Sequence, residues 1–201
     1  MNMDAIDILM NEHRHIERVM DVLERAVAHG RSGGEASPVL FERAAHFLLT
    51  FVDGSHDAKE DEIFQALTAR GLPPGAGVLA ALSGQHALGR ELAEELRDVA
   101  RAVTRGEKEA EELYTLAERY VRLHRGHTEL EESRFFPLVR RLLPVDLMER
   151  VRAKFARIEA AHGSLAEAAD ALELAFPLQA PPLRRVSGGR AHQPWGGRGA
   201  P

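Results

Sequence analysis

The chain has 201 residues, enough for one domain with a sizeable core, and its 44% hydrophobic and 28% charged residues are typical of a soluble globular protein. It has no cysteine, which excludes disulfides, zinc–thiolate sites and cysteine-ligated iron–sulfur clusters, so any metal must bind histidine or carboxylate ligands. The net charge of −5, the lack of a bilayer-length apolar run and an N-terminus unlike a signal peptide lead us to expect a cytoplasmic protein that binds neither nucleic acid nor a membrane.

Helical periodicity dominates the chain, and strand patterns are nearly absent. Four long helices are predicted, over residues 4–29, 38–70, 78–104 and 108–143, and a fifth amphipathic helix follows to residue 176. Gly54 should loosen the second helix, and Pro137 should kink or end the fourth. Long helices joined by short connectors predict an all-α fold, an antiparallel up-down-up-down four-helix bundle with the fifth helix packed outside.

Residues 177–201 differ in composition from the rest of the chain. They are rich in proline and glycine and carry four arginines but no acidic residue. Such a segment lacks the apolar residues that a packed core needs. We therefore expect one helical bundle domain over residues 1–176, followed by a disordered tail.

A histidine–glutamate pair with a spacing of four residues occurs twice, and a lone histidine precedes each pair. Residues four apart lie one above the other on a helix, so each pair directs an imidazole and a carboxylate at one point. The matching members of the two halves are 71 to 73 residues apart. The repeat consists of His13, His56 and Glu60 in the first half and His86, His127 and Glu131 in the second.

Inward residues of four antiparallel helices can meet at one level of a bundle. Four imidazoles and two carboxylates exceed one tetrahedral zinc site, and they suit two metal ions that share both glutamates as bridges. These ligand types favour iron or manganese, although affinity alone does not exclude zinc. With an added oxygen bridge each ion would have about five ligands, which leaves a position open for dioxygen, peroxide or nitric oxide.

Four segments resemble the helix motifs of the hemerythrin-like, HHE cation-binding domain over residues 4–143: EHRHIERVM, HDAKEDEIFQAL, QHALGREL and HTELEESRFFPLV. The ordered set H…HxxxE…H…HxxxE is more specific than any single motif in it. The resemblance implies a four-helix bundle with two non-haem iron ions, bridged by oxygen and carboxylates. By position, the implied ligands are His13, His56, Glu60, His86, His127 and Glu131.

The chain departs from the oxygen-carrying hemerythrins in two places. Arg90 occupies the position of their second histidine on the third helix. On the fourth helix this chain has HxxxE, which ends at Glu131, where the oxygen carriers have HxxxxD. Family members with this arrangement are associated with peroxide decomposition, with responses to nitric oxide or oxygen, and with iron handling. The resemblance therefore implies reactivity toward peroxide, dioxygen or nitric oxide, with catalase-like turnover as the candidate enzymatic activity.

Two other readings of the repeat compete with this one. A sensor or iron-handling module would bind the same metal or gas without turnover. A metal-free or zinc-bearing helical scaffold would use the pairs only as polar helix faces. Iron content, turnover of peroxide and the response to chelators distinguish the three.

Several polar residues lie near the repeat. His15 is about 200° around the helix from His13, which places it on the surface or behind the site. His124 and Tyr120 share the face of His127, and each is either a group near the metal or part of the bundle interior. Among the flanking acids, Asp61 and Glu132 are candidate partners of imidazole N–H groups, and the others are expected to face solvent. These others are Asp57, Glu62 and Glu129.

Overall fold

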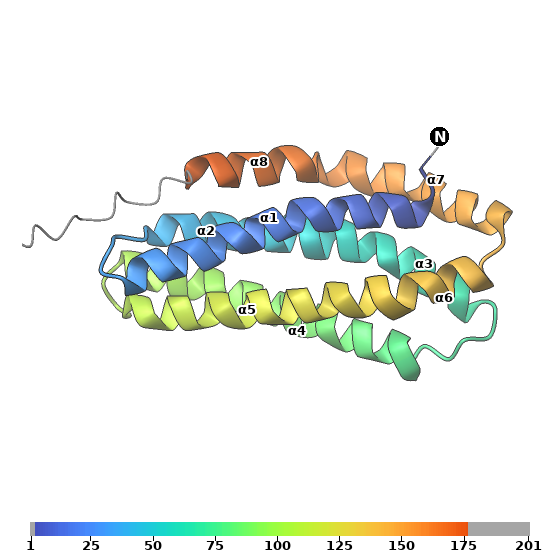
Figure 1. Ribbon diagram of the computed structural model, residues 1–201, viewed down its shortest axis with the longest axis horizontal. Coiled ribbons are helices and arrows are strands. Elements are labelled where there is room, and N and C mark those ends of the chain that lie inside the picture. Colours follow the sequence, from blue (N-terminus) through green and yellow to red (C-terminus); the bar gives the residue numbers. More distant parts are fainter. Residues whose placement is uncertain (1–2, 177–201) are drawn as a thin grey trace, which may run out of the picture.

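The structure is a computed structural model that describes residues 3–176 (Figure 1). The tail predicted over residues 177–201 lies outside the described residues. The described part is helical and contains no strand, as expected for an all-α fold. Its elements are α1 (Ala5–Arg31), α2 (Pro38–Phe47), the π-helix η1 (Leu48–Asp57), α3 (Ala58–Thr68), α4 (Gly77–Thr104), α5 (Ala110–Leu130), the π-helix η2 (Glu131–Phe135), α6 (Phe136–Leu142), α7 (Val145–His162) and α8 (Leu165–Ala175).

Four helical rods lie side by side along the long axis of the molecule (Figure 1). They are α1, the continuous α2–η1–α3 segment, α4, and the continuous α5–η2–α6 segment. The predicted helix ranges agree with these rods to within two residues at each end. α7 and α8 cover one side of the rods, where α8 packs on α1 and α7 packs on α3. Among residues 3–176, no helix has the length and apolarity that a membrane span requires.

α1 shows how the sequence directs one residue of the repeat inward. Asp4 caps the helix, because its carboxylate accepts a hydrogen bond from the Asp7 backbone N–H at 2.7 Å. The apolar residues of the buried face, Leu9 and Ile16 among them, recur at helical spacing. His13 lies on the same face, so the helix buries its imidazole.

The two π-helical segments occur where the sequence predicts disturbed helices. η1 contains Gly54, which faces α7 so closely that a Cβ there would lie 2.9 Å from Nε2 of His162. η2 ends just before Pro137, whose missing N–H breaks the regular ladder upstream. π-helical turns are rare and are often found at functional sites. Here they coincide with both histidine–glutamate pairs, because η1 contains His56 and η2 begins at Glu131.

The prediction of one continuous fifth helix is wrong. The segment is divided into α7 and α8 at Gly163, which has a φ of +82°. Glycine adopts this left-handed conformation without the steric cost that a side chain would add. Ser164 then caps α8 by accepting a hydrogen bond from the Glu167 backbone N–H at 3.2 Å. The Gly-Ser pair in the sequence was a signal for this break.

The apolar core consists of two clusters separated by a polar layer. On α1 one cluster ends at Leu9 and the other begins at Ile16, with His13 between them. The same change of cluster occurs on each of the other three rods at its own residues of the repeat. The repeat therefore interrupts the core at one level of the molecule, and that level is the candidate site.

Candidate metal centre

The six residues of the repeat meet in the buried polar layer. The side chains of His56, Glu60 and Glu131 have no exposed surface, and the other three histidines are at most 9% exposed. Charged or ionisable groups at this depth are costly unless they are paired or bind a metal. Their ligand atoms form two adjacent groups, which we call site 1 and site 2.

Site 1 consists of His13, His56, Glu60 and Glu131, whose ligand atoms all lie within 4.8 Å of one another. Nε2 of His13 is 3.1 Å from Nε2 of His56 and 3.2 Å from Oε2 of Glu131. Nε2 of His56 is 3.8 Å from Oε1 of Glu60. Four ligand atoms from three rods thus converge on one point.

Site 2 consists of Asp57, Glu60, His86 and His127, again within 4.8 Å. Oε2 of Glu60 lies 3.2 Å from Nε2 of His86 and 4.0 Å from Nε2 of His127. Oε1 of Glu131 is 3.2 Å from Nε2 of His127. Glu60 and Glu131 therefore each direct one carboxylate oxygen at site 1 and the other at site 2.

The buried atoms at the centre of the layer lack hydrogen-bond partners. Both carboxylate oxygens of Glu60, both of Glu131 and Nε2 of His86 are buried and form no hydrogen bond, although three of these oxygens lie 3.2 Å from an imidazole nitrogen. A buried polar group without a partner costs about 1–3 kcal/mol, and a charged one costs more. A cation at each site would satisfy these atoms, so the residues present fit a metal centre.

The pKa values of the two carboxylates reflect their burial and their proximity to each other. Burial raises the pKa of Glu131 to about 7. Burial and the adjacent charge of Glu131 also raise the pKa of Glu60. Two carboxylates in one dry site resist ionising together unless positive charge is added.

The four imidazoles divide into two types. Burial opposes the charged form of all four, but nearby carboxylates outweigh it at two and raise the pKa of His56 and of His86 to about 9. Burial lowers the pKa of His127 to about 4 and, with the charge of His56, holds the pKa of His13 well below its usual range. Without a metal, protons on His56 and His86 thus supply positive charge that a cation would replace.

Three of the imidazoles direct Nε2 to the centre and donate a hydrogen bond from Nδ1 to an outer acceptor. His13 donates to Oε1 of Glu132 at 2.9 Å, as anticipated for that carboxylate. His56 donates to Oε2 of Glu12 at 2.9 Å, and His127 donates to Oε1 of Gln85 at 3.1 Å. Metal-binding histidines are commonly held in this way, because the outer bond fixes the tautomer and the ring orientation.

Sequence reasoning missed four buried or half-buried polar residues around the centre. Asp57 was expected to face solvent, but it is buried in site 2, at the end of the π-helical segment η1. Glu12 and Gln85 each directly precede a lone histidine, and that shared place in the repeat was an available signal. Lys59 gave no sequence signal, since it lies in a run of charged residues.

Two other polar residues near the repeat, His15 and Asp61, lie outside the centre. His15 is half-buried and its Nδ1 is 3.3 Å from Nη1 of Arg18. His13, in contrast, lies in the buried polar layer. Asp61 is exposed and forms no hydrogen bond with an imidazole among the described residues.

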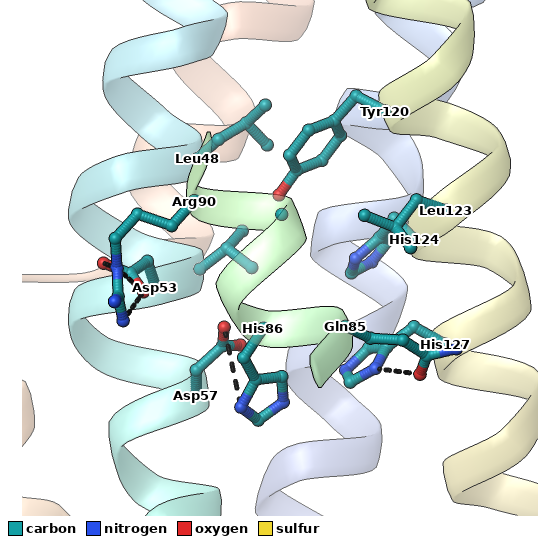
Figure 2. Close-up of a pocket in the computed structure, with 12 residues that line it drawn as sticks. Leu48, Asp53, Asp57, Gln85, His86, Arg90, Tyr120, Leu123, His124 and His127 are labelled. Atoms are coloured by element: carbon teal, nitrogen blue, oxygen red, sulfur yellow. Dashed lines mark hydrogen bonds and ion pairs between the residues drawn. The ribbon is translucent and has the colours of Figure 1, made fainter. Parts of the chain in front are cut away.

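A small cavity of about 20 Å³ adjoins site 2 (Figure 2). His86 and His127 line it together with Tyr120 and His124, whose rings are stacked with centroids 6.3 Å apart. Burial lowers the pKa of His124 well below its usual value and raises that of Tyr120, so both side chains are uncharged. The volume suffices for about one water-sized molecule.

Arg90 stands at the edge of this cavity and forms an ion pair with Asp53, with Nη2 2.7 Å from Oδ1 (Figure 2). Its guanidinium is about half exposed, and its hydrogen bonds go to Asp53, which belongs to neither site. Arg90 therefore supplies no metal ligand at the position where the oxygen carriers have a histidine. Site 2 has two imidazoles, those of His86 and His127, and α4 adds no further one.

A family model described as the hemerythrin HHE cation binding domain matches residues 4–139, which is more than half of the chain. The matched range contains all six residues of the repeat and ends before α7 and α8. Neither a curated protein nor a solved structure matches the chain.

Proposed function

Because this chain belongs to the hemerythrin HHE cation-binding domain family, we propose that its buried polar layer holds two iron ions in a non-haem dinuclear centre. The observation that carries the proposal is the pair of buried carboxylates, Glu60 and Glu131, whose four oxygens form no hydrogen bond and face both sites. The proposed ligands are His13, His56, Glu60, His86, His127 and Glu131, with Asp57 as an additional oxygen ligand at site 2.

The ligand types support iron as the metal. Imidazole and carboxylate in this ratio suit iron and manganese, whereas structural zinc sites hold one ion in a closed tetrahedron. Two adjacent groups of four ligand atoms that share Glu60 support a count of two ions. Unlike a closed structural site, site 2 also adjoins the cavity.

We further propose that the centre reacts with peroxide, dioxygen or nitric oxide. Bound iron supplies redox chemistry and open coordination positions for such molecules. The chain itself supplies a cavity that admits only a very small molecule and is lined by two uncharged polar groups, His124 and Tyr120. Neutral His124 can accept a hydrogen bond from a peroxide molecule that enters, and the Tyr120 hydroxyl can donate one to it.

Peroxide decomposition is the reaction that this site supports best, because it consumes and forms only small molecules and needs no outside reductant. Two molecules of hydrogen peroxide give two of water and one of dioxygen. The apolar residues Leu48, Val52 and Leu123 around the cavity would keep bulk water and larger reductants away.

A sensor or iron-handling role is the second candidate, and one contact favours it. Nζ of the buried Lys59 contacts Glu12, which holds His56, and lies 3.0 Å from Oε1 of Glu159 on α7. Changes at site 1 on metal loading would therefore reach the outer helix pair α7–α8. Such a link suits a protein that reports metal loading to a partner.

We also propose that residues 1–176 form one domain, an antiparallel up-down-up-down four-helix bundle with α7 and α8 packed outside. The short connectors between the rods and their side-by-side packing support this topology.

Metal analysis of the purified and anaerobically reconstituted protein tests the function. We expect two iron ions per chain and an absorption that depends on iron. His56→Ala and Glu131→Ala should lose the iron and the absorption. Glu129→Gln, which changes an exposed carboxylate near His127, is the matched control and should keep its iron. Dioxygen release from peroxide in proportion to iron content supports the enzyme, whereas slow turnover with a conformational change on loading supports the sensor. Protein that contains no iron and takes up none would contradict the proposal.

A further inference from the structure

The two sites have similar ligands but different outer contacts. At site 1 both imidazoles donate Nδ1–H to a carboxylate, His13 to the exposed Glu132 and His56 to the buried Glu12, each at 2.9 Å. At site 2, His127 donates to the neutral amide oxygen of Gln85 at 3.1 Å. Nδ1 of His86 lies 4.0 Å from Asp57, beyond hydrogen-bond distance.

This difference falls on equivalent places of the internal repeat. Glu12 and Gln85 each stand directly before the lone histidine of their half, and each accepts from the histidine of the following pair. One half therefore places a carboxylate where the other places an uncharged amide. The two halves of the repeat thus supply the same types of ligand, but the residues that accept hydrogen bonds from those ligands differ in charge.

A buried lysine holds the carboxylate of site 1 in position. Lys59 has no exposed surface, and its Nζ contacts Oε1 of Glu12 while Oε2 of Glu12 accepts from His56. Glu159 accepts a second hydrogen bond from the same ammonium group at 3.0 Å. The residue equivalent to Lys59 in the second half is Leu130, so site 2 has no such support.

Access to the two sites also differs. The cavity beside the centre is lined by His86, His127 and Asp57 of site 2, but by neither His13 nor His56 (Figure 2). His56 is fully buried, and His13 is stacked on Phe136 with ring centroids 5.5 Å apart. An ion at site 2 would therefore lie beside this cavity, whereas no histidine of site 1 lines it.

A carboxylate that accepts a hydrogen bond from a histidine makes the imidazole a stronger metal ligand and fixes its orientation, and losing such a partner typically costs 10- to 100-fold in metal affinity. We propose that the two metal positions are inequivalent: site 1 loads first and retains its ion, whereas site 2 loads second and exchanges its ion with solution. Glu12, held by Lys59, is the positioning residue that sets this order. The inference rests on the proposed function, because it requires a centre that binds two ions.

Anaerobic titration of the metal-free protein with Fe²⁺ alone, followed by removal with a chelator, tests the inference. We expect two resolved binding steps and release of one ion per chain well before the other. Glu12→Gln should weaken the first step by about 10- to 100-fold and leave the second unchanged. Gln85→Glu should strengthen the second step and bring the two together. Glu129→Gln, an exposed change of the same kind as Glu12→Gln, should alter neither step.

The outcomes separate this inference from the proposed function. Binding of no ion, or of one ion without a second step, overturns the dinuclear centre and the inference with it. Binding of two ions with one affinity, or equal weakening of both steps in Glu12→Gln, overturns the inference alone. Gln85 is only half-buried, so Gln85→Glu should fold even where Glu12→Gln does not, and an unchanged second step in that variant also contradicts the proposal.

Discussion

Glu60 lies between His56 and His86 and directs a different carboxylate oxygen at each, Oε1 at 3.8 Å from Nε2 of His56 and Oε2 at 3.2 Å from Nε2 of His86. His56 and Glu60 belong to one rod, whereas His86 comes from α4. The carboxylate therefore joins the two halves of the repeat at the level where they meet, and Glu131 does the same from the fourth rod.

Replacement of Glu131 by glutamine should separate metal binding from folding. Burial raises the pKa of Glu131 to about 7, so near neutral pH the metal-free protein already holds much of this side chain in its uncharged form. The amide is a close steric match for that form. We expect the unfolding free energy of metal-free Glu131→Gln to stay within about 1 kcal/mol of the parent.

The same variant should lose most of the stabilisation that iron gives the parent protein, because a ligand that binds the folded state stabilises it by mass action. Thermal melts with and without Fe²⁺ measure both quantities. Equal stabilisation by iron in the variant and the parent would argue against Glu131 as a ligand.

The metal-free protein should become less stable as the pH rises from 7 to 9. Burial lowers the pKa of His56 and of His86, but the carboxylates near these two histidines have the larger effect. They raise both pKa values to about 9, above the value of about 6.5 expected in the unfolded chain. Across this window the folded state retains protons that the unfolded state has released. The stabilisation is therefore complete below pH 6.5 and is lost as the pH passes 9.

Urea denaturation at pH 7, 8 and 9 measures this slope. The shifts of His127, to about 4, and of Glu131, to about 7, act at lower pH and do not reverse it. His86→Gln should flatten the dependence, since one of the two groups is gone. A stability that is constant or rises over the window would contradict this assignment of charge.

Replacement of Lys59 by methionine should destabilise the protein strongly. The ammonium group is fully buried and is the cationic partner of the buried carboxylate of Glu12. Removing one member of a buried ion pair leaves an uncompensated charge and costs about 3–5 kcal/mol. The double variant Glu12→Gln/Lys59→Met removes both charges and should recover much of the loss.

A double-mutant cycle by chemical denaturation gives the coupling between the two residues. Glu62→Gln with Lys154→Met, a partly exposed pair on α3 and α7, is a matched control in which little coupling is expected. Additive effects at the buried pair would show that Lys59 does not act through Glu12.

Gly89 offers a way to narrow the cavity without disturbing the fold. It lines the cavity on α4, and a Cβ there would meet only Leu123, at an ordinary contact distance of 3.9 Å. Gly89→Ala should raise stability by about 0.5–1 kcal/mol, as expected inside a helix, and should slow reaction with peroxide. Gly84→Ala, also on α4 and with nothing near its Cβ, should stabilise equally but leave the rate unchanged. Equal rates in the two variants would show that small molecules do not reach the centre through this cavity.

The helical architecture and the six residues of the repeat could be predicted because both depend on periodic patterns. His56 and Glu60 share a helix face through a spacing of four residues, and the matching pair 71 residues later indicated a shared level. The structure places all six at that level.

The outer residues could not be predicted because they depend on geometry that the regular pattern does not contain. Asp57 is buried at the end of the π-helical segment η1, and a regular helical pattern does not predict where such a segment occurs. Lys59 is buried because α7 covers it, and its partner Glu159 is 100 residues away in sequence. The break at Gly163 was visible, but the amphipathic pattern on both sides favoured one continuous helix.

The number of iron ions bound per chain after anaerobic reconstitution with Fe²⁺ tests the central claim most directly. We expect two ions per chain in the parent protein and in Glu129→Gln, and loss of iron in His56→Ala and Glu131→Ala. A parent protein that binds no iron, or that keeps both ions after His56→Ala, would contradict it.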